Sequence, residues 1–125
     1  MPRILIVDDS PTIRKMVRAS LRALESFDFV EATNGLEAIE QVAIGPVALM
    51  ILDLNMPDMH GVDVLKFLRR HPGSRAVPVV VLTTRGDDSS RETAIAAGAT
   101  QYMTKPFVPH MLLSTARELL GVAPA

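Results

Sequence analysis

Three aspartates stand directly after short apolar runs of the sequence. Asp8 and Asp9 follow the run 4–7, and Asp53 follows the run 49–52. If these runs are parallel strands, their carboxyl ends meet at one edge of a sheet, where such sheets bind ligands. Carboxylates a few ångströms apart repel one another, so the group must take up a proton or recruit a cation. Oxygen ligands at a partly open site suit Mg²⁺, which keeps several waters and shares its ligand shell with phosphate oxygens.

A hydroxyl and an amine are expected at the same edge. Thr83 follows the run 79–82, and Lys105 comes shortly after the weaker run 101–103. A carboxylate beside a divalent cation can act as a nucleophile and form an aspartyl phosphate. Phosphoryl transfer then needs positioning and charge neutralisation more than further covalent chemistry. We expect the cation and Lys105 to supply that charge and the Thr83 hydroxyl to bind a phosphoryl oxygen.

Five successive units of one strand and one helix must position these residues. Continuous runs of Val, Ile and Leu favour strands covered on both faces, as in a parallel sheet. Apolar residues three or four apart predict the helices between them. This order predicts an α/β fold with an open, doubly wound sheet, right-handed connections and helices on both faces. The expected strands are 4–7, 29–30, 49–52, 79–82 and 101–103, and the expected helices are 12–24, 36–43, 61–70, 89–97 and 109–120.

Local signals mark several helix ends. Ser10 can cap the first helix, and Pro11 fits its first position. Gly98 and Gly121 are natural stops for the fourth and fifth helices. The pattern contains no linker, so we expect one domain over residues 1–121 with a C-terminal tail at 122–125.

Composition narrows the function further. The 125 residues are 48% hydrophobic and 22% charged, which suits one folded domain. A net charge of −1 without a run of Lys or Arg offers no field for nucleic acid. The absence of cysteine excludes disulfides, zinc–thiolate sites and thiol catalysis. No run approaches the roughly 18 apolar residues of a membrane span, and the N-terminus is unlike a signal peptide. We therefore expect a cytoplasmic protein that does not insert into membranes.

The motifs around these residues are similar to those of one known family. The sequence resembles the receiver domain of two-component response regulators, especially the single-domain, chemotaxis-type members, from about Arg3 to Gly121. Each motif alone is a weak signal, but their order and their places at the strand ends make the combination specific. The motifs are Asp8-Asp9-Ser10, Ala32-Thr33-Asn34-Gly35-Leu36-Glu37-Ala38, Asp53-Leu54-Asn55-Met56-Pro57 with Gly61, Leu82-Thr83-Thr84, Ala97-Gly98-Ala99, Tyr102 and Lys105-Pro106-Phe107.

The resemblance implies a phosphoacceptor and a metal site. Asp53 would accept the phosphoryl group. Mg²⁺ would be held by Asp8, by Asp9 as the more direct ligand, by Asp53 and by the backbone carbonyl of Asn55. The sheet would have the flavodoxin-like strand order 2-1-3-4-5.

The resemblance also implies a switch and its partners. Thr83 and Lys105 would contact the phosphoryl group, Tyr102 would be the aromatic switch residue, and the peptide bond before Pro106 would be cis. A histidine kinase or phosphotransfer domain would donate the phosphoryl group. An output protein would bind the face built by the fourth helix, fifth strand and fifth helix, and the chain would be a monomer. The protein would be a signalling switch rather than an enzyme, and single-domain members suggest chemotaxis or motility.

Phosphorylation is expected to change the affinity of that face. It would draw Thr83 toward Asp53, and Tyr102 would turn into the vacated space, which shifts the population of two states. Two residues depart from the family pattern. Thr84 stands where a smaller Ala or Gly is usual, which would narrow access for phosphodonors. Arg85 occupies a variable position near the phosphoryl group, where it could slow attack by water.

The same residues also have ordinary structural interpretations. Asp8 and Asp9 could cap the first helix, Thr83 could be a plain strand residue, Lys105 a solvated loop residue and Tyr102 a packing residue. A basic stretch on the first helix could be a solvated face or a docking surface for an acidic kinase or phosphotransfer bundle. Its members are Arg14, Lys15, Arg18 and Arg22. The histidines have no partner spacing and are expected on the surface: His60, His71 and His110.

Three other functions are less well supported. A receiver could serve as a phosphate sink without an output partner. A Mg²⁺-dependent hydrolase with an aspartyl-phosphate intermediate would need a second acid and a cap domain, but Asn55 follows two residues after Asp53. A flavin-binding protein would need a Gly-rich phosphate loop after the first strand, where Asp8 and Asp9 would repel phosphate.

Overall fold

The computed structural model describes residues 1–123, in which five strands alternate with five helices. All strand pairs are parallel, and the order across the sheet is β2-β1-β3-β4-β5. This confirms the predicted doubly wound α/β fold and its strand order. The strands are β1 (Arg3–Val7), β2 (Asp28–Ala32), β3 (Leu49–Leu52), β4 (Val79–Thr83) and β5 (Gln101–Thr104). The helices are α1 (Pro11–Ser20), α2 (Gly35–Ile44), α3 (Gly61–Arg70), α4 (Asp88–Ala97) and α5 (Pro109–Leu120).

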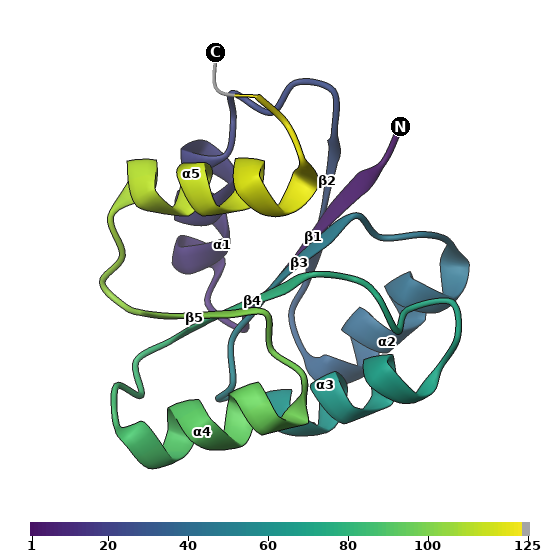
Figure 1. The fold of residues 1–125 in the computed structure, drawn as a ribbon, viewed down its shortest axis with the longest axis vertical. Helices are drawn as coiled ribbons and strands as arrows, with labels where there is room; N and C mark the ends of the chain where they lie inside the picture. The colour runs from purple at the N-terminus through teal and green to yellow at the C-terminus, as the bar shows by residue number, and fades with distance from the viewer. Residues whose placement is uncertain (124–125) are drawn as a thin grey trace.

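The sheet separates two hydrophobic cores. Figure 1 shows α1 and α5 on one side of the sheet and α2, α3 and α4 on the other. Leu5 and Val7 of β1 lie in the core beneath α2, α3 and α4, whereas Ile4 and Ile6 lie in the core beneath α1 and α5. The strands β3 and β4 divide their side chains in the same way and are buried along their whole length. Their continuous apolar runs therefore reflect burial on both faces.

The helix α1 ends earlier than its apolar spacing predicts. The prediction extended to residue 24, but α1 ends at Ser20 and a turn follows. In this turn the N–H groups of Arg22 and Leu24 donate to carbonyls only three residues back. Leu21 and Leu24 still fill the core beneath α1 and α5, with at most 2% of their surface exposed. The apolar spacing thus predicted burial correctly, while a tighter turn replaced the last turn of helix.

The predicted cap and stop residues of the helices are confirmed, and the helix bounds other than the end of α1 agree with the prediction to within one residue. The Ser10 hydroxyl accepts the N–H of Ile13 at 3.2 Å, and Pro11 is the first residue of α1. Gly98 and Gly121 follow α4 and α5 with φ values of 116° and 68°, a left-handed conformation that favours glycine. Of the expected tail, residues 124–125 lie outside the described part of the chain. Among residues 1–123, no helix is long and apolar enough to cross a membrane.

The strand register brings the predicted site residues to one edge of the sheet. Val7 pairs with Leu52, so Asp8 and Asp53 are the next residues on the adjacent strands β1 and β3. On β4 and β5, Thr83 pairs with Thr104, the residue directly before Lys105. The strand order reverses at β1 and β3, and open α/β sheets bind ligands in the crevice beyond that point.

Candidate functional site

The three predicted aspartates form one cluster at the carboxyl ends of β1 and β3. One carboxylate oxygen from each of Asp8, Asp9 and Asp53 lies within 4.8 Å of the other two. Asp8 and Asp53 are 3% and 5% exposed, whereas Asp9 faces solvent. The cluster therefore combines two buried acids with one open side.

Lys105 provides the counter-charge for this cluster. Its Nζ lies 2.7 Å from Asp8 Oδ2 and 3.7 Å from Asp53 Oδ2, and its side chain is largely buried. The Lys105 backbone N–H donates to the Thr83 carbonyl at 2.8 Å, which ties the start of the loop to β4. The bond between Lys105 and Pro106 is cis, which confirms that prediction. One ammonium is thus shared by two buried carboxylates.

The electrostatic environment disfavours the charged form of Asp53. Burial raises the pKa of its carboxyl above the ordinary value of 3.8, while the ammonium of Lys105 lowers that pKa and the charge of Asp8 raises it. Smaller effects on the same pKa come from an Asn55 backbone hydrogen bond, which lowers it, and from Asp9, which raises it. One ammonium among three carboxylates leaves negative charge that a further cation would neutralise.

The donor set fits Mg²⁺. This ion binds oxygen ligands at about 2.0–2.1 Å, so two of its ligands lie at most about 4.2 Å apart. The aspartate oxygens already lie within 4.8 Å of one another, so small side-chain movements would let all three contact one ion. The exposed side at Asp9 leaves room for the waters that Mg²⁺ retains. When bound, the ion supplies positive charge that offsets the repulsion between a phosphoryl group and the aspartates.

Hydrogen bonds join Thr83 to Tyr102. Thr83 is fully buried at the end of β4, and its hydroxyl accepts the backbone N–H of Arg85 at 3.4 Å. The backbone carbonyl of Arg85 in turn accepts the Tyr102 hydroxyl at 2.5 Å. Tyr102 lies on β5, is half-buried and packs against the core beneath α2, α3 and α4. Two hydrogen bonds through Arg85 therefore connect Thr83, at the same edge of the sheet as the aspartates, with Tyr102 on β5.

Comparison with known proteins decides the family. The chain matches the family model for the response regulator receiver domain over residues 4–117. The chain belongs to this receiver family. Chemotaxis protein CheY1 of Helicobacter pylori is 36% identical to this receiver over 120 residues, which cover 95% of this chain and 97% of that protein. The chemotaxis protein CheY homolog of Campylobacter jejuni is 34% identical, with coverage of 95% and 92%.

Solved structures of response regulators share the fold over nearly the whole chain. Chemotaxis response regulator CheY4 of Vibrio cholerae has a TM-score of 0.86 at 33% identity, and the match covers 96% of this chain and 99% of that one. A putative response regulator from Chloroflexus aurantiacus has a TM-score of 0.89 at 32% identity, with coverage of 97% and 99%. Receiver domains are signalling switches, and they generally take a phosphoryl group on an aspartate and bind Mg²⁺ at an acidic pocket. In this receiver, Asp8, Asp9 and Asp53 form an acidic cluster.

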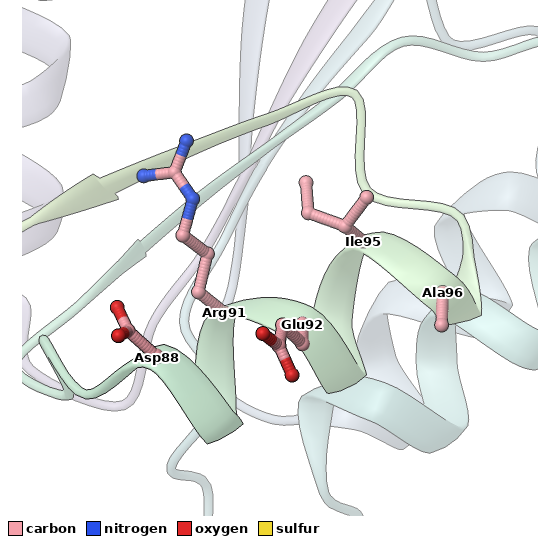
Figure 2. Close-up of a pocket in the computed structure, with 5 residues that line it drawn as sticks. All are labelled: Asp88, Arg91, Glu92, Ile95 and Ala96. Carbon is pink, nitrogen blue, oxygen red and sulfur yellow. The ribbon is translucent and has the colours of Figure 1, made fainter.

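Two contacts near the receiver site were not predicted from the sequence. The guanidinium carbon of Arg91 lies 5.9 Å from the centre of the Tyr102 ring, within the range of a cation–π interaction. Figure 2 shows the Arg91 side chain extending from α4 toward the strands, beside Asp88. The second contact is a pair of hydrogen bonds from the first turn of α2 to the Asp58 carboxylate. Sequence spacing could not reveal either contact, because each joins elements whose relative placement depends on packing.

The basic stretch of this receiver is partly engaged within the fold. Arg14 and Arg18 pair with the carboxylate of Glu31 on β2 at 2.8 and 3.2 Å. A second nitrogen of Arg14 donates to the backbone carbonyl of Asp8 at 2.8 Å. Lys15 and Arg22 are exposed. Half of the stretch therefore stabilises the packing of α1 on β1 and β2. The histidines His60, His71 and His110 are exposed, as predicted.

Proposed function

We propose that this receiver, over residues 1–121, accepts a phosphoryl group on Asp53 from a histidine kinase or phosphotransfer domain. The observation that carries the proposal is the meeting of Asp8, Asp9 and Asp53 with the Lys105 ammonium. Asp8, Asp9, Asp53 and the Asn55 carbonyl would hold Mg²⁺. Nowhere else among residues 1–123 do three acidic side chains come together in this way.

The chemical step needs little beyond this arrangement. An oxygen of the Asp53 carboxylate attacks the phosphorus of a phosphohistidine, and the P–N bond breaks with its electron pair left on the imidazole nitrogen. That nitrogen then takes a proton from solvent, so charge and atoms balance. Lys105 already lies 3.7 Å from Asp53 and would neutralise a phosphoryl oxygen, while the buried Thr83 hydroxyl would donate to another. Positioning and charge neutralisation account for the reaction.

The switch would run along the path from Thr83 to Tyr102. If the Thr83 hydroxyl turns to a phosphoryl oxygen, its bond to the Arg85 N–H is lost. Arg85 also supplies the carbonyl that accepts the Tyr102 hydroxyl, so its movement would displace Tyr102. A change at Asp53 would thereby alter the surface formed by α4, β5 and α5, and a partner that prefers one state would read it.

An output protein would bind this α4-β5-α5 surface. The surface carries exposed apolar side chains, namely Ile95 of α4, Met111 of α5 and Val108 directly before α5. Figure 2 shows charged and apolar side chains along α4, where Asp88, Arg91 and Glu92 precede Ile95. Such a mixed surface suits reversible contact with another protein. Several relatives are chemotaxis proteins, so we place the signal in chemotaxis or motility of a cytoplasmic, monomeric switch.

Mass mapping tests the phosphoacceptor. The full chain is incubated with acetyl phosphate and Mg²⁺, and the acyl phosphate is trapped by borohydride reduction before peptide analysis. We expect a single modified peptide that contains Asp53, no modification of Asp53→Asn, and none when EDTA replaces Mg²⁺. Modification at another aspartate, or equal modification in EDTA, would contradict the proposal. Pull-downs with and without beryllofluoride then distinguish an output switch from a phosphate sink.

A further inference from the structure

Asp58, in the loop between β3 and α3, reaches the first turn of α2. Its Oδ1 accepts the N–H of Gly35 at 3.1 Å, and its Oδ2 accepts the N–H of Leu36 at 3.0 Å. The partners lie 23 and 22 residues away along the chain. Gly35 and Leu36 begin α2, where backbone N–H groups have no partner within the helix. A carboxylate is also favoured there by the helix dipole.

The helix α2 also has a cap of its own. The Asn34 side chain accepts the N–H of Glu37 at 2.8 Å, and the Glu37 carboxylate accepts the backbone N–H of Thr33 at 2.7 Å. The Asn34 bond is an ordinary N-cap, and the Glu37 carboxylate ties down Thr33, the residue directly before that cap. Asp58 therefore links α2 to a loop that is distant in the sequence, and it is not the sole cap of the helix.

The loop that carries Asp58 is closed at its base. The N–H of Gly61 donates to the Leu54 carbonyl at 3.0 Å. A Cβ at Gly61 would lie 2.7 Å from the Asp53 carbonyl oxygen, so only glycine allows this approach. Near Asp58 the loop also packs tightly on α2, because a Cβ at Gly35 would lie 2.7 Å from the Met59 Cβ. The loop is thus fixed at two points: at Leu54, at its base, and at Asp58, which is hydrogen-bonded to α2. The segment between these points consists of Asn55, Met56 and Pro57.

We propose that Asp58 is a positioning residue for the metal site. By fastening the loop to α2, it holds the Asn55 backbone carbonyl where a divalent cation would bind. This inference rests on the proposed function, because Asn55 is a ligand only if Asp53 shares a Mg²⁺ site. The Asn55 side chain is exposed, so its own packing contributes little to fixing the loop. A ligand that is held in place before binding loses less conformational freedom when the ion binds.

The test compares Asp58→Ala with Asn34→Ala in the full chain. Both changes remove a side-chain cap from the first turn of α2, but only Asp58→Ala cuts the bond to the loop. Mg²⁺ affinity is measured by isothermal titration calorimetry, and the Mg²⁺ dependence of phosphorylation by acetyl phosphate is measured separately. We expect Asp58→Ala to weaken Mg²⁺ binding about tenfold, as losses of ligand-orienting groups do. Its phosphorylation rate at saturating Mg²⁺ should remain within about twofold of the wild type.

The outcomes separate this inference from the proposed function. Asn34→Ala should keep wild-type Mg²⁺ affinity, and Asp58→Asn, which retains one carbonyl oxygen, should recover part of the loss. Unchanged affinity in Asp58→Ala, or equal weakening in Asn34→Ala, would overturn the inference. If circular dichroism shows that Asp58→Ala is unfolded, Asp58→Asn takes its place against the same control. A wild-type chain that binds no Mg²⁺ would overturn the proposed function itself.

Discussion

Replacing Asp53 with asparagine is expected to stabilise the protein in the absence of Mg²⁺. The substitution keeps the shape and one oxygen acceptor but removes a buried charge. That charge lies within 4.8 Å of two carboxylates and 3.7 Å from the Lys105 ammonium. At an effective dielectric constant of about 20, each repulsion is about 3.5 kcal/mol and the attraction is about 4.5 kcal/mol. The two repulsions together exceed the attraction by about 2–3 kcal/mol.

Solvent and burial adjust this balance in opposite directions. Asp9 is exposed, so solvent weakens its repulsion. Burial of Asp53 raises its pKa and adds to the cost of the charge. We expect a net gain of about 1–2 kcal/mol for Asp53→Asn at pH 7. At about 4 °C per kcal/mol for a domain of this size, the melting temperature should rise by about 4–8 °C.

The assay is thermal unfolding in EDTA, followed by circular dichroism over a range of pH. Because the folded pKa of Asp53 is raised, the charge weakens the wild type only where the carboxylate ionises. The extra stability of Asp53→Asn over the wild type should be absent below pH 3.8, the ordinary pKa of the carboxyl. It should grow as the pH rises from there to the raised pKa of the folded state, and it should be complete at higher pH. Glu40→Gln, which neutralises an exposed acid on α2, serves as the matched control and should change little.

Adding Mg²⁺ should reverse the order of stability. A ligand at one hundred times its Kd stabilises the folded state by about 2.7 kcal/mol, and Asp53→Asn lacks one of the proposed ligands. A folded Asp53→Asn protein that is equally stable or less stable than the wild type in EDTA at pH 7 would refute the reasoning. That result would mean that the attraction to Lys105 outweighs both repulsions and burial.

Two further predictions concern the switch. Tyr102 is the only tyrosine of a chain without tryptophan, so protein fluorescence reports on that ring alone. Beryllofluoride with Mg²⁺ should change the emission of Tyr102. Replacing Thr83 in Thr83→Ala should remove most of that change. A full response in Thr83→Ala would exclude the path through Arg85. Arg85→Glu should shorten the lifetime of the phosphorylated protein several-fold in a dephosphorylation assay, because it replaces a cation that disfavours attack by water with an anion. An unchanged lifetime would contradict the role of Arg85 in slowing hydrolysis.

The elements of the fold could be predicted because burial on two faces leaves a simple pattern. The runs that become β3 and β4 are apolar throughout, and the acids and hydroxyl that follow them occupy the strand ends. The main error, the end of α1, has a physical cause. Apolar spacing at Leu21 and Leu24 records contact with the core, and a tight turn satisfies that spacing as well as a helix does.

The contacts that tie elements together could not be predicted in the same way. Asp58 follows a proline in a short loop, and this local context is typical of an ordinary turn acid. Its bonds to Gly35 and Leu36 exist only because α2 and the β3–α3 loop meet at one end of the sheet. Arg91 likewise reaches Tyr102 only after α4 packs beside β5. Sequence periodicity determines which face of an element is buried, but not which polar side chains meet across elements.

The charge arrangement that would make Asp53 reactive is also a source of instability. Three carboxylates share one ammonium, so part of the stability gained from the two cores is lost to repulsion at the strand ends. A cation that binds there gains by relieving this repulsion. An uncharged side chain at position 53 removes the two repulsions that involve Asp53 and so weakens the attraction of the site for a cation. The stability of Asp53→Asn in EDTA and its weak response to Mg²⁺ therefore have one origin. If Asp53→Asn were more stable in EDTA but responded to Mg²⁺ like the wild type, or the reverse, repulsion among the carboxylates could not be the force that draws the cation into the site.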